Sequence, residues 1–267
     1  MGASTKTTWR VIGPETRDAK TNMFIDKLLL ESVSKGMAPQ TIRFYQFSHP
    51  SITTPVDASS FANYIEGVDL AERPTGGKTL FHDPLDLTVS VVGLKTEELN
   101  KKPEIYLWFR SMIRDSLKDM GIESAELSFP EKEKESEFCV MDTRLSNGRT
   151  PVAPEVTVNG RKISGSTARL TPNAFLVHGS IFYKPDLKFM SGLFGKRKPA
   201  IKRSMTWINE YTEIESKGVF SHLFEHFTKD KEIVIEGFND YEKELIQKEL
   251  QNVNLQAKVY PDPQASL

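Results

Sequence analysis

The sequence predicts an α+β fold in which a mixed β-sheet is flanked by helices. Segments that favour strands alternate with scattered segments that favour helices along the 267 residues, without an internal repeat or a long low-complexity tract. Two early strand segments have the pattern of half-buried strands, which favours a mixed sheet over a doubly wound parallel one. We expect residues 1–17 to be a flexible N-terminus and 18–267 a single domain, in which 204–267 could form a helical C-terminal lobe.

The first half of this domain is predicted to begin with a helix. Residues 18–35 place apolar side chains at roughly helical spacing, and Gly36 follows as a stop signal. Pro103 opens a second helix that ends at about Met120, since proline is tolerated in a first helical turn. The remaining elements of this half are strands at 42–47, 68–72 and 87–92 and a short helix at 60–66.

The second half is predicted to contain more strands and to end in helices. The dipeptide Asn159-Gly160 lies between two β-prone segments and indicates a hairpin, because both residues tolerate the positive φ angles of a type I′ turn. The stretch 184–203 is basic and is expected to be a loop. Further strands are predicted at 125–127, 138–141, 156–158, 161–164, 175–183 and 232–236, and further helices at 213–227 and 240–251.

Composition excludes several classes of function. Charged residues make up 27% of the chain and the net charge is −1, so charge gives no argument for a nucleic-acid or membrane partner. The longest apolar runs are too short to span a bilayer, and the polar N-terminus lacks the apolar core of a secretory signal. The single cysteine, Cys139, permits no intramolecular disulfide and no thiolate metal cluster. We therefore expect a reducing, cytoplasmic location, and separately we expect a monomer.

A metal site is not expected either. His222 and His226 lie four residues apart, a spacing that can bind a metal from one face of a helix. The sequence around them does not match His-Glu-x-x-His, and no third ligand is evident. An ordinary helix is the better interpretation.

Two glycine turns with basic neighbours mark the predicted functional site. Glycine lets the backbone turn tightly and approach a ligand closely, and a lysine can bind a negatively charged or carbonyl oxygen. Neither turn matches a Walker loop or a dinucleotide fingerprint. The first turn lies in the run RPTGGKTLFHD (73–83), the second in GRKISGSTAR (160–169), and a strand with the sequence LVHGSI (176–181) follows.

The order and spacing of these motifs resemble the lipoyl/octanoyl transferase and lipoate-protein ligase family, closest to its cysteine-dependent octanoyltransferase branch. The resemblance spans roughly residues 22–183 and implies the biotin/lipoate protein ligase-like catalytic fold. Two departures concern the acyl pocket: Glu72 replaces a second arginine, and the segment 49–55 lacks the usual glycine-containing loop. The acyl chain that this protein prefers therefore stays open.

The resemblance also implies site residues. Lys162 would contact the acyl carbonyl or an adenylate phosphate, where a cation stabilises developing negative charge. Cys139 stands where the transferase branch has the cysteine that forms an acyl thioester, although a lone cysteine is otherwise a small packing residue. The implied substrate-binding residues are Arg73, Thr75, Gly76, Gly77, Lys78, His82, Gly165, Ser166, His178 and Gly179.

Three functions stay open. The first is octanoyl transfer from acyl carrier protein to a lysine of a lipoyl carrier domain, such as glycine cleavage H protein or a 2-oxoacid dehydrogenase E2, without a cofactor. The second is a lipoate- or octanoate-protein ligase, which would use ATP and Mg and form an acyl adenylate. The third is a non-catalytic relative that binds the lipoyl domain. The basic run 196–203 is either a solvated loop or a docking surface for an acidic partner such as a carrier protein or lipoyl domain.

Overall fold

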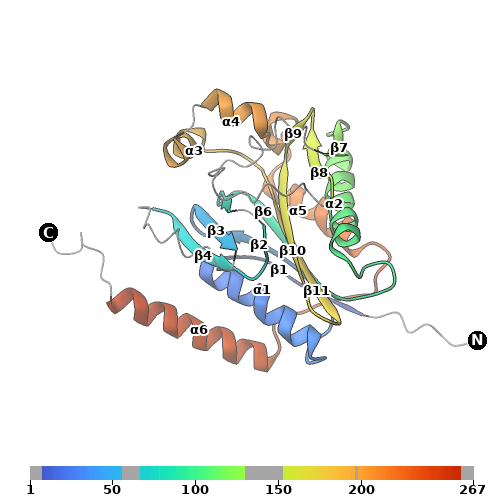
Figure 1. Cartoon of the computed structure of the whole chain (residues 1–267), viewed down its shortest axis with the longest axis vertical. Helices are drawn as coiled ribbons and strands as arrows, with labels where there is room; N and C mark the ends of the chain where they lie inside the picture. The colour runs from blue at the N-terminus through green and yellow to red at the C-terminus, as the bar shows by residue number, and fades with distance from the viewer. Residues whose placement is uncertain (1–7, 56–66, 78, 130–152, 196–197, 260–267) are drawn as a thin grey trace, which may run out of the picture.

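The computed structural model describes residues 8–55, 67–77, 79–129, 153–195 and 198–259 (Figure 1). From the N-terminus, the elements are β1 (Trp9–Arg17), α1 (Ala19–Ser34), β2 (Thr41–Phe47), β3 (Ser51–Pro55), β4 (Asp69–Arg73), β5 (Leu80–His82), β6 (Leu87–Leu94), α2 (Lys102–Asp119), β7 (Ala125–Ser128), β8 (Glu155–Val158), β9 (Arg161–Lys162), β10 (Ser164–Leu170), β11 (Ala174–Ile181), α3 (Leu187–Phe194), α4 (Lys198–Ser204), the 3₁₀ turn η3 (Ile208–Glu210), α5 (Ser216–Thr228), β12 (Ile233–Ile235) and α6 (Asp240–Val259).

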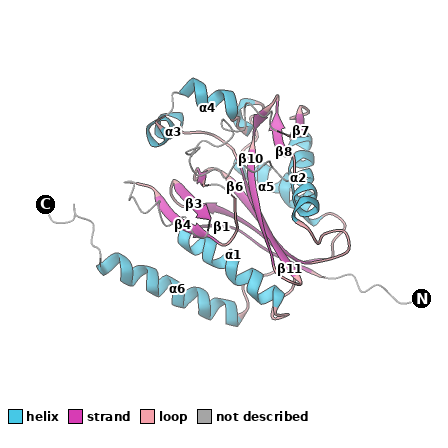
Figure 2. Ribbon diagram, viewed as in Figure 1, coloured by secondary structure: helices cyan, strands magenta, loops and turns pink. Residues whose placement is uncertain are grey.

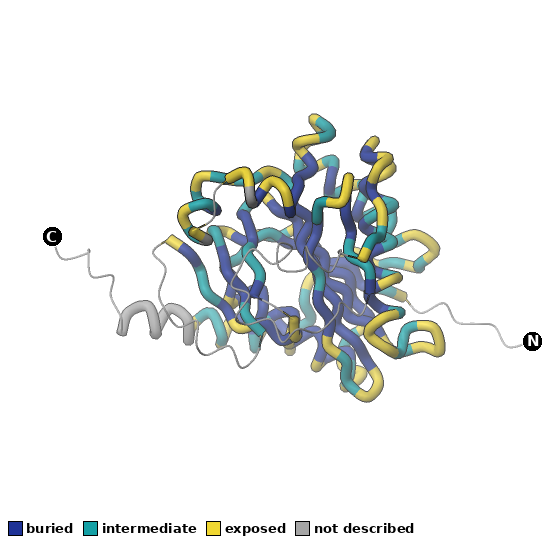
Figure 3. Tube along the Cα trace, turned by 45° about the horizontal axis from the view of Figure 1, so that its top comes forward, coloured by how far each residue is buried: buried dark blue, intermediate teal, exposed yellow. Residues whose placement is uncertain are grey.

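A central sheet with strand order β10-β11-β6-β2-β1-β12 organises the molecule. β1 pairs in parallel with both β2 and β12, whereas the other pairs are antiparallel, so the sheet is mixed. Helix α1 lies on one side of the strands and α2 on the other (Figures 1 and 2), and the buried residues gather along the strands between them (Figure 3). The predicted α+β class is therefore confirmed. Two smaller sheets, β4-β3-β5 and β7-β8-β9, flank the central one.

The N-terminal segment differs from the prediction. We expected 1–17 to be flexible, but Trp9–Arg17 form strand β1, which lies between β2 and β12. The prediction was wrong there because the partner of this strand comes from the far end of the chain, as Trp9 pairs with Ile233. The segment after residue 204 accordingly supplies a strand to the same sheet, and Phe227 of α5 is part of the main core, so the expected separate C-terminal lobe is not formed.

The basic stretch 184–203 is also not the expected loop, because it contains α3 and α4. The Asp186 carboxylate caps α3 by accepting hydrogen bonds from the backbone N–H groups of Lys188 and Phe189, at 3.0 and 2.9 Å. Gly195 ends the helix in the left-handed conformation. Buried Met190 and Ile201 pack with Phe182, Met205 and Trp207, an apolar pattern that the many lysines concealed in the sequence.

Strand β2 is buried on both faces rather than half-buried. Arg43, Tyr45 and Phe47 are all fully buried, because α1 covers the face of the sheet on which they lie. Phe44 on the other face packs edge-on against Phe220 of α5, at 5.1 Å between ring centroids. A buried arginine such as Arg43 needs ionic partners, and its partners belong to the functional site described below.

Most other local predictions are confirmed. The four predicted helices at 18–35, 103–120, 213–227 and 240–251 correspond to α1, α2, α5 and α6, with small shifts at their ends. Asn159 and Gly160 form the predicted hairpin turn between β8 and β9, with φ angles of 51° and 70°. The helix predicted at 60–66 and the strand predicted at 138–141 lie outside the described residues. Among the described helices, none has the length and apolar content needed to cross a bilayer.

One ion pair joins the two ends of the fold. Arg10 donates from Nη1 and Nη2 to Oε2 and Oε1 of Glu242, at 2.7 and 2.8 Å, and neither side chain is more than 1% exposed. Glu242 also caps the start of α6: its carboxylate accepts a hydrogen bond from the Asn239 N–H, and its own N–H donates to the Asn239 side chain.

We predict that Glu242→Ala lowers the free energy of unfolding by about 3–5 kcal/mol, because it leaves a buried guanidinium without its carboxylate. Urea denaturation followed by circular dichroism measures this. The matched control is Glu244→Ala on the same helix, whose exposed carboxylate binds Lys248, and we expect it to leave the midpoint almost unchanged. Similar losses in the two variants would contradict the prediction.

Candidate functional site

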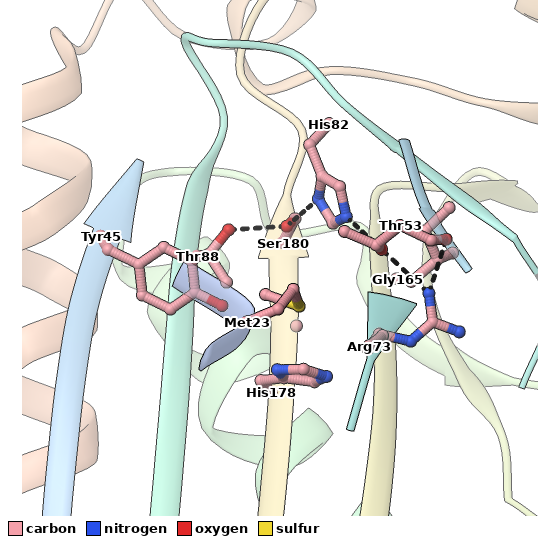
Figure 4. A pocket seen from close by; sticks show the side chains of 11 residues that line it. Met23, Tyr45, Thr53, Arg73, His82, Thr88, Gly165, His178 and Ser180 are labelled. Carbon is pink, nitrogen blue, oxygen red and sulfur yellow. Dashed lines mark hydrogen bonds between the residues drawn. The ribbon is translucent and has the colours of Figure 1, made fainter. Parts of the chain in front are cut away.

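A small pocket lies where the strands β3, β4 and β5 meet β6, β10 and β11 (Figure 4), and the predicted residues Thr75, Gly76 and Gly77 do not line it. Its empty volume of about 220 Å³ includes space that is open to solvent. Its lining includes five of the predicted site residues, namely Arg73, His82, Gly165, His178 and Gly179. Met23 of α1 and Leu80 of β5 add apolar surface. The pocket therefore suits a largely apolar group.

The buried side chain of Arg73 holds the glycine turn in place through hydrogen bonds. Its side chain is 1% exposed, and its Nη1 donates to both the carbonyl and the hydroxyl oxygen of Thr53, each at 2.9 Å. Its Nε donates to Thr75 Oγ1 at 3.1 Å and its Nη2 to the Gly76 carbonyl at 2.9 Å. Burial lowers the pKa of Arg73 to about 10, so the guanidinium stays positively charged at neutral pH beside the pocket.

Gly77 allows the turn to approach β10 closely. It has φ +98°, and a Cβ at this position would lie 3.3 Å from Thr167 Oγ1. The same Thr167 hydroxyl donates to the Gly76 carbonyl at 2.7 Å, so the turn is attached to the strand opposite. Gly77 thus needs to be glycine, whereas a Cβ on Gly76 would meet nothing within 4 Å, and the contact of both with substrate remains a prediction. Lys78, the next residue, lies outside the described residues and its contact with substrate remains a prediction.

A buried chain of hydrogen bonds connects the turn to helix α1. Thr75 Oγ1 lies 2.8 Å from His178 Nε2, and His178 Nδ1 lies 2.7 Å from Asp26 Oδ2. Burial alone would raise the pKa of Asp26, but the hydrogen bond and charge of His178 and the charge of Arg43 lower it below its usual value. Asp26 is therefore an ionised acceptor, and Nδ1 of His178 must carry the proton that it donates. These hydrogen bonds fix the orientation of the His178 ring and, through it, the position of Thr75.

The residues around Asp26 were not predicted from the sequence. Arg43 Nη1 donates to Asp26 Oδ1 at 3.2 Å, Arg43 Nη2 donates to Asn22 Oδ1 at 2.6 Å, and the Tyr45 hydroxyl donates to Asp26 Oδ2 at 2.9 Å. The available signal was an asparagine and an aspartate four residues apart on the apolar stripe of the first helix. A charged residue there indicates a buried ionic partner, but does not say which one.

His82 lines the pocket as an uncharged side chain. Its Nδ1 lies 2.9 Å from Ser180 Oγ, its Nε2 lies 2.8 Å from Thr53 Oγ1, and its ring stacks on Phe47 with 4.2 Å between centroids. Burial holds the pKa of His82 well below its usual 6.5, and the neighbouring Arg73 and His178 lower it further. The ring can therefore position hydroxyl groups in the pocket without acting as a cation.

We predict that His82 makes stability depend on pH. The folded state keeps this histidine neutral, whereas the unfolded chain binds a proton below pH 6.5, so stability present at pH 7.5 is lost as the pH falls. The slope below pH 6.5 should approach about 1.4 kcal/mol per pH unit. Urea denaturation at pH 7.5 and pH 5 of the wild type and of His82→Gln, which does not titrate, tests this. Equal losses in both proteins would contradict it.

Lys162 lies at the rim of the pocket, next to Gly165. A Cβ on Gly165 would be 4.0 Å from Lys162 Cε. Lys162 Nζ lies 3.4 Å from Glu155 Oε2, and both side chains are mostly buried. Glu155 Oε1 in turn accepts from Arg110 Nη2 of α2 at 3.1 Å. The lysine is thus held at the rim by a carboxylate that is itself fixed.

The Ser166 side chain is not brought to the pocket. Its hydroxyl accepts from Arg110 Nε at 2.8 Å, on the side of β10 that faces α2. Alternation along the strand explains this, since Gly165 and Thr167 face the glycine turn. Gly179 lies opposite Ser166 in the sheet, and a Cβ there would be 2.9 Å from Ser166 Cβ. Only glycine therefore fits at position 179.

Other candidates from the sequence are placed differently. Cys139 lies outside the described residues, so its role as nucleophile remains a prediction. His226 Nε2 lies 2.7 Å from Asp119 Oδ2, which gives this histidine a partner on α2. Within the described ranges there is no cluster of three or more histidine, cysteine or acidic side chains that could hold a metal ion.

Comparison with known proteins agrees with this geometry. Residues 18–228 match the lipoyl protein ligase A/B catalytic domain family. Octanoyltransferase LipM of Halalkalibacterium halodurans is 32% identical over 214 residues, which are 74% of this chain and 74% of that protein. The LipM of Anoxybacillus flavithermus is 28% identical over 269 residues, 90% of this chain and 92% of that protein.

Solved structures show the same fold. A crystal structure of lipoate-protein ligase A bound with ATP superposes with a TM-score of 0.69 at 17% identity, covering 90% of this chain and 93% of that one. A lipoate protein ligase described as putative, from T. acidophilum with bound lipoic acid, gives a TM-score of 0.68 at 19% identity, covering 91% and 95%.

Proposed function

Because this chain belongs to the lipoyl protein ligase A/B catalytic domain family, we propose that it is an acyltransferase of lipoate biosynthesis. It moves an octanoyl group from octanoyl acyl carrier protein to a lysine of a lipoyl carrier domain. Relatives that are called octanoyltransferase LipM and that align over most of this chain support the transferase. The likeness to ligase structures supports the shared catalytic fold alone.

The pocket is the observation that supports this function best. The surface that its lining residues expose is mainly apolar, as an acyl chain requires, and Gly165 of the lining is next to Lys162, where the acyl carbonyl would lie. In acyl transfer the negative charge develops on that carbonyl oxygen, and a fixed cation stabilises it more in the transition state than in the ground state. Glu155 and Arg110 hold Lys162 in place before the substrate arrives.

Cys139 supplies the nucleophile in the proposed reaction. Its thiolate attacks the carbonyl carbon of the donor thioester; the bond from that carbon to the carrier sulfur breaks, and the carrier leaves as a thiolate that takes up the proton Cys139 released. The acceptor lysine amine then attacks the new thioester; an amide forms, the bond from the carbonyl carbon to the Cys139 sulfur breaks, and the amine proton passes to that sulfur. A thioester donor is already activated, so ATP and Mg are not required. A cysteine that must stay reduced fits a reducing, cytoplasmic location. The proposed reaction uses residues of one chain, so we propose that the protein acts as a monomer.

The ligase hypothesis is the second candidate, because the family and the structural neighbours include lipoate ligases. In that case ATP and Mg would activate the free acid, Lys162 and the Gly76-Gly77 turn would contact the phosphate of the adenylate, and Cys139 would be a packing residue. A non-catalytic carrier-binding relative is disfavoured by the LipM relatives.

Mass spectrometry of an apo lipoyl domain incubated with the purified protein tests these functions. One reaction contains octanoyl acyl carrier protein without ATP, and the other contains free octanoate or lipoate with ATP and Mg. A mass gain only in the first supports the transferase, and a gain only in the second supports the ligase. No gain in either would overturn both catalytic proposals.

A further inference from the structure

The helices α3 and α4 present a concentrated positive charge on a chain that is nearly neutral overall. Residues 184–205 contain seven lysines and arginines but one acidic residue, Asp186, whereas the whole chain has a net charge of −1. Five of these basic residues are described and exposed, and we call them the α3–α4 basic surface: Lys184, Lys188, Lys198, Lys202 and Arg203.

No described acidic side chain pairs with this charge. Among the described residues, none of the five basic groups has a carboxylate within ion-pair distance. Two acidic groups near this surface have other partners: Asp186 accepts two backbone N–H groups at the start of α3, and Glu210 pairs with Arg161 at 2.9 Å. The surface is therefore available to an acidic partner.

Hydrogen bonds connect the segment that carries the α3–α4 basic surface to Arg161 and Lys162 of β9. The backbone N–H of Thr206 donates to the Lys162 carbonyl at 2.9 Å, and Arg161 Nη1 donates to the Lys202 carbonyl at 3.3 Å. Below the surface, Phe81 of β5 approaches Phe189 of α3 with 6.0 Å between ring centroids. Because Leu80, the neighbour of Phe81, lines the pocket, the helices that carry the basic surface lie close to the pocket.

We propose that the α3–α4 basic surface docks the acyl carrier protein that delivers the octanoyl group. The inference rests on the function proposed above. An acidic carrier protein complements this charge, and complementary charge accelerates encounter and fixes orientation. The donor is a better match than the acceptor, because its acyl chain hangs from a phosphopantetheine arm, whose phosphodiester adds a fixed negative charge that an acceptor lysine lacks.

The test reverses three charges on α4 in the full-length protein, as Lys198→Glu/Lys202→Glu/Arg203→Glu. We expect kcat/KM for octanoyl acyl carrier protein to fall at least about tenfold, mainly through KM, and to depend less on salt than in the wild type. With the short thioester octanoyl N-acetylcysteamine, which has neither phosphate nor carrier protein, kcat/KM should stay within about twofold. The matched control is Lys27→Glu/Lys243→Glu/Lys248→Glu on α1 and α6, which lie away from α3 and α4 in Figure 1; it should leave both donors unaffected.

Three outcomes of the kinetic test overturn the proposal. An unchanged rate with octanoyl acyl carrier protein would show that the donor docks elsewhere. A loss with both donors would show that the substitutions damage the catalytic rim or the fold. A raised KM for the lipoyl domain, with the donor unaffected, would assign the surface to the acceptor. Salt-dependent binding of octanoyl acyl carrier protein, measured by calorimetry, separates this inference from the reaction itself. If the wild type binds the carrier but transfers nothing, the proposed function fails and the docking surface stands.

Discussion

Replacing Cys139 with alanine is expected to abolish octanoyl transfer from acyl carrier protein to the lipoyl domain. If the octanoyl group passes through a thioester on this side chain, no other group in the chain can replace its sulfur, since Cys139 is the single cysteine. Loss of the nucleophile in an enzyme that forms a covalent intermediate typically costs roughly 10⁴–10⁶ in kcat. Transfer is measured as the mass gain of the apo lipoyl domain over time.

The intermediate itself provides a second measurement. The wild type incubated with octanoyl acyl carrier protein, without acceptor, should gain the mass of one octanoyl group, and peptide mapping should place it on Cys139. The Cys139→Ala protein should remain unmodified but still bind the carrier with wild-type affinity. Full transfer by Cys139→Ala would show that the cysteine is a packing residue. ATP-dependent transfer by that variant would favour the ligase.

Lys162→Ala is expected to lower kcat about 100- to 1,000-fold, the usual cost of removing one group that stabilises an oxyanion. Donor KM should change much less, because the lysine contributes mainly in the transition state. Lys162→Arg should recover part of the rate, since the charge is kept but the planar guanidinium cannot take the position of a compact ammonium. Single-turnover kinetics with octanoyl N-acetylcysteamine isolates this effect from carrier docking.

The matched control for Lys162 is its neighbour on the same strand. Arg161 points away from the pocket and binds the Tyr211 hydroxyl at 2.7 Å and Glu210 at 2.9 Å. Arg161→Ala should therefore retain most of the activity toward the short thioester. A loss of less than tenfold in Lys162→Ala, or equal losses in the two variants, would remove Lys162 from the mechanism.

Local sequence features predicted the parts of the fold that depend on near neighbours. The helix at 18–35 and the Asn159-Gly160 hairpin are determined by periodicity and by turn residues, and both are present. The glycine turn was identified as part of the site because its residues have a specific backbone requirement, which the φ of Gly77 illustrates.

Features that depend on distant partners could not be predicted in this way. The hydrogen bond between Asp26 and His178 joins residues 152 positions apart, and nothing near either one in the sequence identifies the other. Strand β1 was missed for the same reason, since its two partner strands come from opposite ends of the chain. The helix α4 was missed because its basic residues Lys198, Lys202 and Arg203 outnumber Ile201, the apolar residue that it buries.

The bond between Arg10 and Glu242 has a consequence for the protein as it is being made. Arg10 leaves the ribosome 232 residues before its partner, which at about 5–20 residues per second is a delay of more than roughly ten seconds. Throughout that time β12 is missing as well, so the outer edge of β1 is open to pairing with other chains. A polypeptide stopped at residue 228 would stay in this unfinished state, and the last forty or so residues therefore act as the closing step of biogenesis.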